Sequence, residues 1–452
     1  MKSTFEIRQE YFYLIEKYGE ENKLAALAMK ENVERSPLYY NGHLKYSTVH
    51  IPRIYTKVDL DRFQWIVGTA YGIFAKVIGA YFAHAGYRAL FPFSQELEEL
   101  ILTPRGYDSI IPISRADIFY NEETGDFGFC EINTDGTSGM DANRILDKIM
   151  IDNPAHQEMI RRYRFETMEL FDRWVGTFMR IYDTYEGKVS HPNVAIVDFI
   201  DKATWREFQE FARSFQKNGI DCEICDIRQL HFEDGKLYSS NGHVIDAIYR
   251  RAVTADIMDN LDDVRPFLQA VRENACFIAG HFCTQIIHHK WLFYILHHPE
   301  TTKFLSPDET KFIEAHIPKT FPLEKDAIDL EEVINHRKRY ILKPRDAYAA
   351  SGVFAGVDYP QKKWEEQVRL VYDNGYICQE YWPQYVNQNI DFAWGKGKWC
   401  PYINMTGLYA YDGEFAGIFS RLATNGGIIA AGHNEQAQPT YIVTDKTNEV
   451  KK

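Results

Sequence analysis

The sequence predicts an α/β protein of several domains, and three observations lead to this expectation. A chain of 452 residues is long enough for about two to four domains. Hydrophobic residues make up 45% of it and aromatic residues 15%, which is ample for large cores. Between residues 194 and 251, short apolar runs alternate with an amphipathic helical pattern, which is typical of a doubly wound α/β domain.

The first block, residues 1–155, opens with a helical pattern over 7–29 and contains the most apolar run of the chain, residues 63–91. Lys76 and several glycines interrupt that run, so we interpret it as a buried core helix and expect no membrane span. The residues that form its helical stripe are Leu60, Phe63, Ile66, Val67, Ala70, Ile73, Phe74, Val77 and Ile78.

A hairpin with polar residues on one face follows in the same block. Side chains along a strand alternate between faces, so Glu131 and Asn133 point the same way. A polar turn over 121–126 brings Asp117 opposite them, and Arg115 shares the face of Asp117. Two carboxylates, one amide and one guanidinium are therefore expected on a single patch.

Oxygen ligands without histidine or cysteine suit Mg²⁺, which commonly binds through one or two carboxylates and the phosphates of a substrate. Asp117, Glu131 and Asn133 are thus candidate metal ligands in a nucleotide site. The alternative is an edge hairpin whose solvent face carries these residues without any metal, with Arg115 in an ordinary surface ion pair.

The first block ends in a glycine-bearing loop, 136–139, ahead of a helical pattern. Ser138 and Asp141 have the spacing of a capping box, so the loop is expected to present free amide groups at a helix start. Such a helix start attracts anions, although plain capping is the commoner use of the pattern.

The second block, residues 156–285, is predicted to hold a long helix over 159–185 and then strands and helices in alternation. The expected strands are 194–199, 221–226 and 244–251, and the expected helix is 205–217. The first strand is not followed by GxGxxG, so nothing indicates a dinucleotide site.

The third block, residues 286–452, contains lysines and turns that suit a nucleotide. Lys343 ends an apolar strand before a small-residue loop that includes Ser351 and Gly352, an arrangement by which backbone amide groups cover phosphates. Taken alone, a lysine with this placement is more commonly an exposed residue at the end of a strand, and that is the favoured interpretation of Lys343 by itself. The candidate residues that follow are a hinge of Gln379, Glu380, Tyr381 and Trp382 before a proline, then Arg421 and Asn425 beside a tight turn.

The composition argues against two classes of function. A formal charge of −13 disfavours binding of duplex nucleic acid, because that affinity comes mostly from Lys and Arg. The seven cysteines are scattered and odd in number, which indicates a reducing compartment, and the absence of an apolar segment after Met1 leads us to expect a cytoplasmic protein. Cys222 and Cys225 form a CxxC without a second pair, so zinc or redox use is disfavoured.

Taken in chain order, these features resemble the ATP-grasp superfamily of carboxylate–amine ligases. They are Arg115-x-Asp117 with Glu131-x-Asn133, Lys290, Lys343-Pro344 with its loop, the Gln379-Glu380 hinge, and Arg421 with Asn425-Gly-Gly427. In that superfamily the lysines and the hinge usually come first and the R-x-D…E-x-N element last, whereas here this element comes first. The order is similar to that of the circularly permuted, glutathionylspermidine synthase-like ATP-grasp proteins, and the resemblance covers nearly the whole chain.

The resemblance implies a domain organisation. Residues 1–155 would be the permuted N-terminal part of the ATP-grasp fold, with the magnesium element. Residues 156–285 would be a Rossmann-like pre-ATP-grasp domain, and residues 286–452 the ATP-binding subdomain.

The resemblance also implies an ATP- and Mg²⁺-dependent ligase that joins a small or peptide carboxylate to an amine through an acyl phosphate. Lys290 and Lys343 would contact phosphates, and Ser351 and Gly352 would cover them. The hinge residues 379–382 would bind adenine, and Arg115, Arg421 and Asn425 would stabilise or position the reacting groups. A phosphotransferase and a nucleotide-binding protein without catalysis are the alternatives. The sequence does not indicate an oligomeric state or identify the two substrates.

Overall fold

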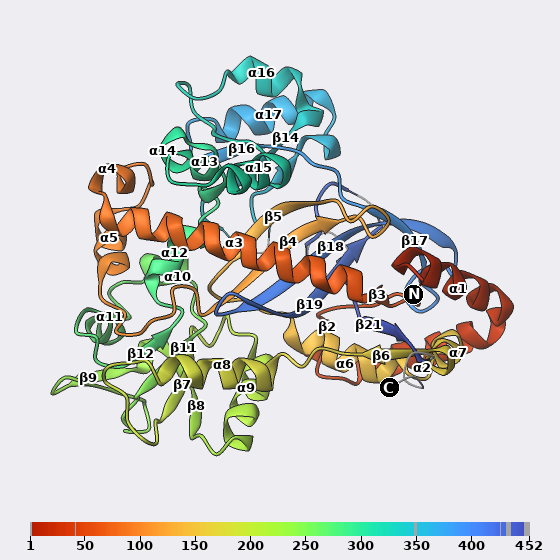
Figure 1. The fold of residues 1–452 in the computed structure, drawn as a ribbon, viewed down its shortest axis with the longest axis horizontal. Helices are drawn as coiled ribbons and strands as arrows, with labels where there is room; N and C mark the ends of the chain where they lie inside the picture. The colour runs from red at the N-terminus through yellow and green to blue at the C-terminus, as the bar shows by residue number, and fades with distance from the viewer. Residues whose placement is uncertain (1, 41, 348–349, 425, 431–434, 447–452) are drawn as a thin grey trace.

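The fold is a mixed α/β arrangement of three principal sheets and their covering helices (Figure 1). It is known from a computed structural model that describes residues 2–40, 42–347, 350–424, 426–430 and 435–446. The expected α/β class is confirmed in these coarse terms.

The largest sheet joins strands from both ends of the chain. Its order is β20-β19-β18-β4-β5, with β17 paired to β18, and all pairs are antiparallel. The strands β4 (Ile113–Tyr120) and β5 (Phe127–Asn133) come from the first block. The others come from the last: β17 (Val386–Ile390), β18 (Trp399–Tyr411), β19 (Glu414–Ala423) and β20 (Gln436–Gln438). The C-terminal part of the third block is therefore continuous with the first block.

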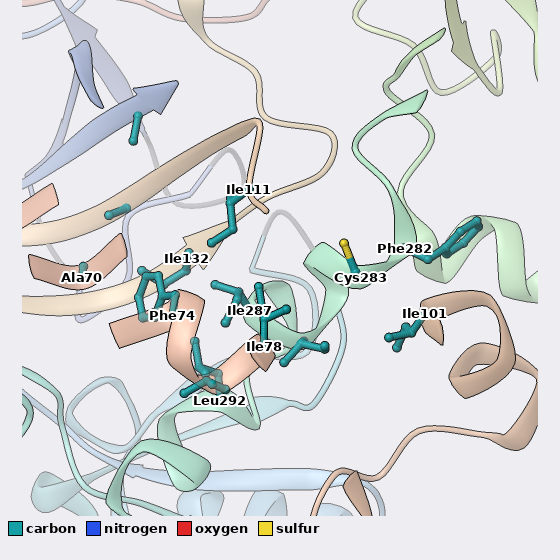
Figure 2. Close-up of a cluster of buried hydrophobic side chains, with 14 of the residues drawn as sticks. Ala70, Phe74, Ile78, Ile101, Ile111, Ile132, Phe282, Cys283, Ile287 and Leu292 are labelled. Carbon is teal, nitrogen blue, oxygen red and sulfur yellow. The ribbon is translucent and has the colours of Figure 1, made fainter. Parts of the chain in front are cut away.

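One long helix, α3 (Lys57–Ala83), lies across this sheet (Figure 1). Its apolar stripe is buried as expected, because Ala70, Phe74 and Ile78 pack in one core with residues such as Ile132 of β5 and Leu292 (Figure 2). Among the described residues, α3 is the one helix whose length and hydropathy would allow it to cross a membrane, and 44% of its most apolar window is buried within the protein. Length and composition alone are weak evidence for a span, and here the apolar side has a packing partner inside the fold.

The second sheet is parallel and has the order β12-β11-β7-β8, as expected for a doubly wound domain. Its strands are β7 (Val194–Asp198), β8 (Cys222–Asp226), β11 (Ala247–Arg250) and β12 (Phe277–Ala279). Alternate side chains of β7 enter different cores, one shared with α8 (Phe171–Tyr182) and α9 (Trp205–Lys217), the other with α11 (Arg265–Arg272). The chain leaves β7 toward β8 on one side and later adds β11 on the other. The strand order therefore reverses between β7 and β11.

The third sheet, at the top of Figure 1, has the antiparallel order β13-β16-β14-β15. Its strands are β13 (Thr320–Pro322), β14 (Tyr340–Pro344), β15 (Phe354–Ala355) and β16 (Tyr376–Glu380). The helices α16 (Leu330–Asn335) and α17 (Gln361–Val371) cover it, and Trp364 and Leu342 are fully buried between these layers. Lys343 and Gln379 lie on its neighbouring central strands.

Two predicted helices prove to be interrupted. The pattern over 7–29 forms α1 (Thr4–Lys17) and α2 (Gly19–Glu34), which meet at Tyr18. The helix expected over 159–185 is wrong: α7 (Pro154–Arg162) and α8 are separated by the strand β6 (Tyr163–Glu166). The reason is long-range pairing, because β6 is antiparallel to the C-terminal strand β21 (Thr440–Asp445), whose other neighbour is β3 (Arg53–Tyr55).

The remaining elements are shorter or connect the sheets. The strands are β1 (Tyr39–Tyr40), β2 (His43–Leu44), β9 (His231–Glu233) and β10 (Lys236–Tyr238). The helices are α4 (Ala85–Arg88), α5 (Gln95–Leu102), α6 (Met140–Met150), α10 (Thr254–Asp259), α12 (Gln285–His288), α13 (Leu292–His297), α14 (Pro299–Thr302) and α15 (Pro307–His316).

Candidate active site

A cavity of about 330 Å³ lies where the three principal sheets approach one another. This volume is within the range of pockets that bind small molecules. Residues from all three blocks line the cavity, including most of the residues that the sequence singled out. Those residues are Arg115, Glu131, Asn133, Lys290, Lys343, Gln379, Glu380, Tyr381, Trp382 and Arg421.

The hairpin β4–β5 has the register that the sequence predicts. Asp117 pairs with Glu131 and Arg115 pairs with Asn133, with an irregularity just after Asp117. The amide nitrogen of Asn133 lies 3.3 Å from Asp117 Oδ2 and 3.3 Å from Glu131 Oε1. The two carboxylates and the amide therefore converge on one face of the hairpin.

Asp117 is fully buried, with 0% of its surface exposed, and two guanidinium groups hold its carboxylate. Arg115 donates from Nε to Oδ1 at 2.8 Å and from Nη2 to Oδ2 at 2.9 Å. Arg421 donates from Nη2 to Oδ2 at 2.6 Å. We call Arg115, Asp117 and Arg421 the Asp117 cluster. The sequence did not indicate that Arg421 pairs with Asp117, because the two residues lie on β19 and β4, which are separated in the sheet by β18.

Glu131 lies in a field of positive charge from both ends of the chain. Burial alone would raise the pKa of its carboxyl group. The positive charges of Lys290, Lys343, Arg421 and Arg115 outweigh burial and lower this pKa to about 2. Glu131 is therefore ionised at neutral pH. The charges of Lys290 and Lys343 are close enough to this residue of the β4–β5 hairpin to lower its pKa.

The two lysines are held by hydrogen bonds. Lys343 Nζ donates to Gln379 Oε1 at 2.8 Å and to the carbonyl oxygen of Cys130 at 3.1 Å. Gln379 in turn donates to the hydroxyl of Thr320 at 2.9 Å, so its side chain orients the lysine. Lys290 Nζ donates to the carbonyl oxygen of Ala347. Lys343 is thus a buried cavity lysine and not an exposed one.

The hinge after β16 offers less open backbone than the sequence suggested. The amide of Glu380 donates to the carbonyl of Lys319 at 2.8 Å, and the amide of Tyr381 donates to the carbonyl of Arg339 at 2.7 Å. The indole of Trp382 lies against Gly128, where an added Cβ would be 2.4 Å from the ring. Tyr381 and Trp382 nevertheless line the cavity and offer it aromatic surface.

The remaining candidates of the third block lie at its margin. Ser351 is exposed and is not among the cavity-lining residues, whereas its neighbours Ala350 and Val353 are. Gly352 has a φ of +69°, a conformation that favours glycine in this turn. Asn425 lies outside the described residues, but Gly427, two positions later, borders the cavity.

The helix start at 136–140 is not a free anion site, which corrects the expected capping box. Gly139, with a φ of +103°, is the N-cap of α6, and no side chain caps this helix. The amide groups of Gly139 and Met140 instead donate to the carboxylate of Glu207, at 2.8 and 3.0 Å. Glu207 comes from α9, so a residue remote in sequence already supplies the anion that the helix start attracts.

The structure adds cavity residues that the sequence reasoning missed. They are Asp135, Asp198, Lys202, Arg251, Asp256 and His288. Asp198 and Arg251 lie at the carboxyl ends of β7 and β11, where the strand order reverses, which is the usual ligand crevice of a doubly wound sheet. Because ligands commonly bind where the strand order reverses, the residues at the ends of the two predicted strands could have been named as candidates from the sequence.

The donor set fits a divalent cation in part. The described residues hold no group of three or more His, Cys, Asp or Glu side chains arranged for a metal. Glu131 and Asn133 border the cavity and offer a carboxylate and an amide, which suit Mg²⁺. Asp117 would join them only by giving up a hydrogen bond from Arg115 or Arg421.

Comparisons with known proteins give similarity in structure but not in sequence. No protein-family model and no curated protein matches this chain. A solved structure described as a glutathione synthetase like-effector (GSS30) from Globodera pallida, in apoform, matches with a TM-score of 0.61 at 13% identity. The match covers 98% of this chain and 100% of the other. The whole chain therefore has a fold similar to that of this solved structure.

Proposed function

We propose that the protein is an ATP-dependent ligase that joins a carboxylate to an amine through an acyl phosphate, on a circularly permuted ATP-grasp fold of the glutathionylspermidine synthase-like kind. One observation carries this proposal. Lys290 and Lys343 act on Glu131, with Arg115 and Arg421, inside one cavity, although these residues come from opposite ends of the chain. A triphosphate and its metal need this combination of positive groups around an ionised acid.

The lining of the cavity contains groups that suit both parts of a nucleotide. Phe129, Ile341 and the rings of Tyr381 and Trp382 form an apolar wall for adenine. Lys343 and Lys290 line the same cavity, and their ammonium groups would contact the phosphates. The alanine-rich loop after Lys343 would cover them from one side.

Glu131 and Asn133 would hold Mg²⁺, together with Asp117 if it is released from one of its arginines. A bound Mg²⁺ would neutralise charge that develops on the phosphates during transfer. Glu131 is suited to this role because its low pKa keeps it ionised.

Arg115 and Arg421 would stabilise the acyl phosphate and the oxyanion formed when the amine attacks it. Asp117 orients both groups, since it receives hydrogen bonds from each. Arg115 also donates to the carbonyl oxygen of Ser138 at 2.6 Å, which connects it to the loop before α6. An acyl phosphate hydrolyses in water, so the enclosed position of these residues is useful.

A second candidate is a nucleotide-binding protein without catalysis. The saturated carboxylate of Asp117 favours it, because both of its oxygens already accept hydrogen bonds from arginine. The matching structure is itself described as an effector. An ATP-grasp phosphotransferase that stops at a phosphorylated product is the third candidate.

A substrate screen separates these candidates. ADP release is measured with ATP, Mg²⁺ and pooled amino acids, short peptides and polyamines. A ligase releases ADP and, with hydroxylamine in place of the amine, yields a hydroxamate, whereas a kinase acting on a hydroxyl yields none. A rise in melting temperature with ATP but no ADP release from any pool would contradict the ligase.

The variant Glu131→Gln tests the site itself. It should abolish ADP release, because the cavity loses the charge on which the cations converge. Glu366→Gln, on the exposed side of α17, is the matched control and should behave as wild type. Near-normal turnover in Glu131→Gln would show that Glu131 has no role in catalysis.

A further inference from the structure

The part of the cavity at the ends of β7 and β11 contains an acid that the phosphate chemistry does not use. Asp198 is the last residue of β7, and β11 ends beside it at Arg250. The strand order reverses between these strands, so their carboxyl ends form a crevice. The crevice belongs to the same cavity as Lys290 and Lys343.

Asp198 is 9% exposed and has little internal compensation for its charge. Its Oδ1 accepts a hydrogen bond from the amide of Phe199 at 2.8 Å. Within the part of the chain that the structure describes, no ion pair involves Asp198 and no hydrogen bond reaches its Oδ2. Burial raises the pKa of this carboxyl group to about 7, although the charge of Arg251 opposes the rise. A carboxylate placed this way gains most from a cationic ligand.

The charged groups near Asp198 already have partners of their own. Arg251 pairs with Glu207 at 3.1 Å. Lys202 pairs with Asp256. Arg250 donates to the carbonyl of Ala252 at 2.7 Å and to the hydroxyl of Thr254 at 3.1 Å. No ion pair joins Asp198 to any of these cations. A cationic ligand that enters from the cavity would therefore not have to displace a side chain from Asp198.

From this arrangement we infer that the β7–β11 crevice binds the amine substrate through an ammonium group, with Asp198 as the carboxylate that receives it. The attacking nitrogen gives up its proton to solvent water before it forms the C–N bond, and phosphate leaves. The inference rests on the proposed ligase function and names the chemical class of its second substrate, a primary amine that carries positive charge. ATP and the carboxylate substrate would bind in another part of the same cavity, beside Lys290, Lys343 and Arg421.

Competition between two nucleophiles tests the inference. Ethylenediamine is cationic at neutral pH and hydroxylamine is not, so a mixture of the two reports how well the protein recognises charge. With ATP, Mg²⁺ and pooled amino acids and dipeptides, Asp198→Asn should lower the ratio of amide to hydroxamate about 10- to 100-fold, the size expected for a lost charged hydrogen bond. Asp198→Glu should restore part of the ratio. Asp201→Asn, an exposed position outside the cavity, is the matched control and should keep the wild-type ratio.

The pH dependence gives a second readout that a structural role would not produce. In the wild type, the KM for ethylenediamine should rise as the pH falls through about 7, because Asp198 becomes protonated. The charged groups that face it are Arg250, Arg251 and Asp256. The Asn variant should have a higher KM and a weaker dependence on pH. The dependence that remains comes from ethylenediamine itself, whose second amino group is protonated near pH 7.

Two outcomes would overturn the inference: an unchanged product ratio in Asp198→Asn, or the same pH dependence in that variant and the wild type. If the wild type forms no hydroxamate from any acid, the proposed ligase function fails instead. Ligand-observed NMR with ethylenediamine alone then tests the crevice separately. Binding that weakens in Asp198→Asn, with Asp201→Asn as the control, supports the crevice, and equal binding by both variants rejects it.

Discussion

The variant Asp117→Asn should lose stability as well as activity, which is a stronger expectation than the sequence alone suggested. From the sequence, this change removes a metal ligand from a surface hairpin and leaves the fold intact. In the structure, Asp117 is fully buried and is the counter-charge of two guanidinium groups, those of Arg115 and Arg421. The asparagine side chain has the same shape but no charge, so both guanidinium groups lose the negative charge of Asp117.

The magnitude follows from the contacts. Removing one partner from a buried ion pair costs about 3–5 kcal/mol, because the other charge remains buried without compensation. Arg421→Gln should cost less, about 1–3 kcal/mol, because Asp117 keeps two hydrogen bonds from Arg115. The double variant should be less destabilised than the sum of the two single variants, since they share one interaction.

The assay is urea unfolding at neutral pH, followed by tryptophan fluorescence, on the two single variants and the double variant. Asp262→Asn, an exposed acid with a surface arginine partner, is the control and should change the free energy of unfolding by less than about 0.5 kcal/mol. The reasoning is refuted if Asp117→Asn behaves like this control, or if the effects of the two single changes simply add. Either result would mean that Asp117 does not stabilise the fold through its ion pairs with Arg115 and Arg421.

Three further predictions follow from other contacts. Lys343→Ala should chiefly weaken ATP binding, about tenfold or more by calorimetry, because a phosphate loses a charged partner; unchanged affinity would exclude Lys343 from the nucleotide site. Burial lowers the pKa of His50 to about 3, so this residue contributes stability at neutral pH that is lost as the pH falls from about 6.5 toward 3. His50→Gln should therefore reduce the pH dependence of the urea midpoint in that window, and identical slopes would contradict the burial effect. Glu207→Gln should accelerate hydrogen exchange at the amides of Gly139 and Met140, and equal protection would show that another group caps α6.

Sequence reasoning succeeded where the signal was local. The hairpin register of Asp117 and Glu131 follows from a two-residue alternation on each side of a short polar turn. The helix predicted over 205–217 matches α9, because its apolar spacing lies within a single element. The stripe that contains Phe63 and Ile78 is buried for the same reason.

Sequence reasoning failed where a distant segment supplied the partner. The residues of β6 have a helical pattern on either side, but they pair with β21, which lies more than half the length of the chain away. Ser138 has the spacing of a capping residue, yet Glu207 occupies the amide groups of that helix start. In both cases a tertiary contact outweighs a weak local preference.

The sequence by itself determined which residue types lie along which strand and helix, because side-chain periodicity is a property of neighbouring residues. That was enough to predict the α/β class, the acid-bearing hairpin, the lysine strands and the doubly wound sheet. The tertiary structure alone decided the charge state and the partners of the site: Asp117 held by two arginines, Glu131 ionised among lysines, and Asp198 without an ion pair to any residue that the structure describes. The physical reason is that electrostatic energy depends on distance and burial in space, and segments hundreds of residues apart determine both.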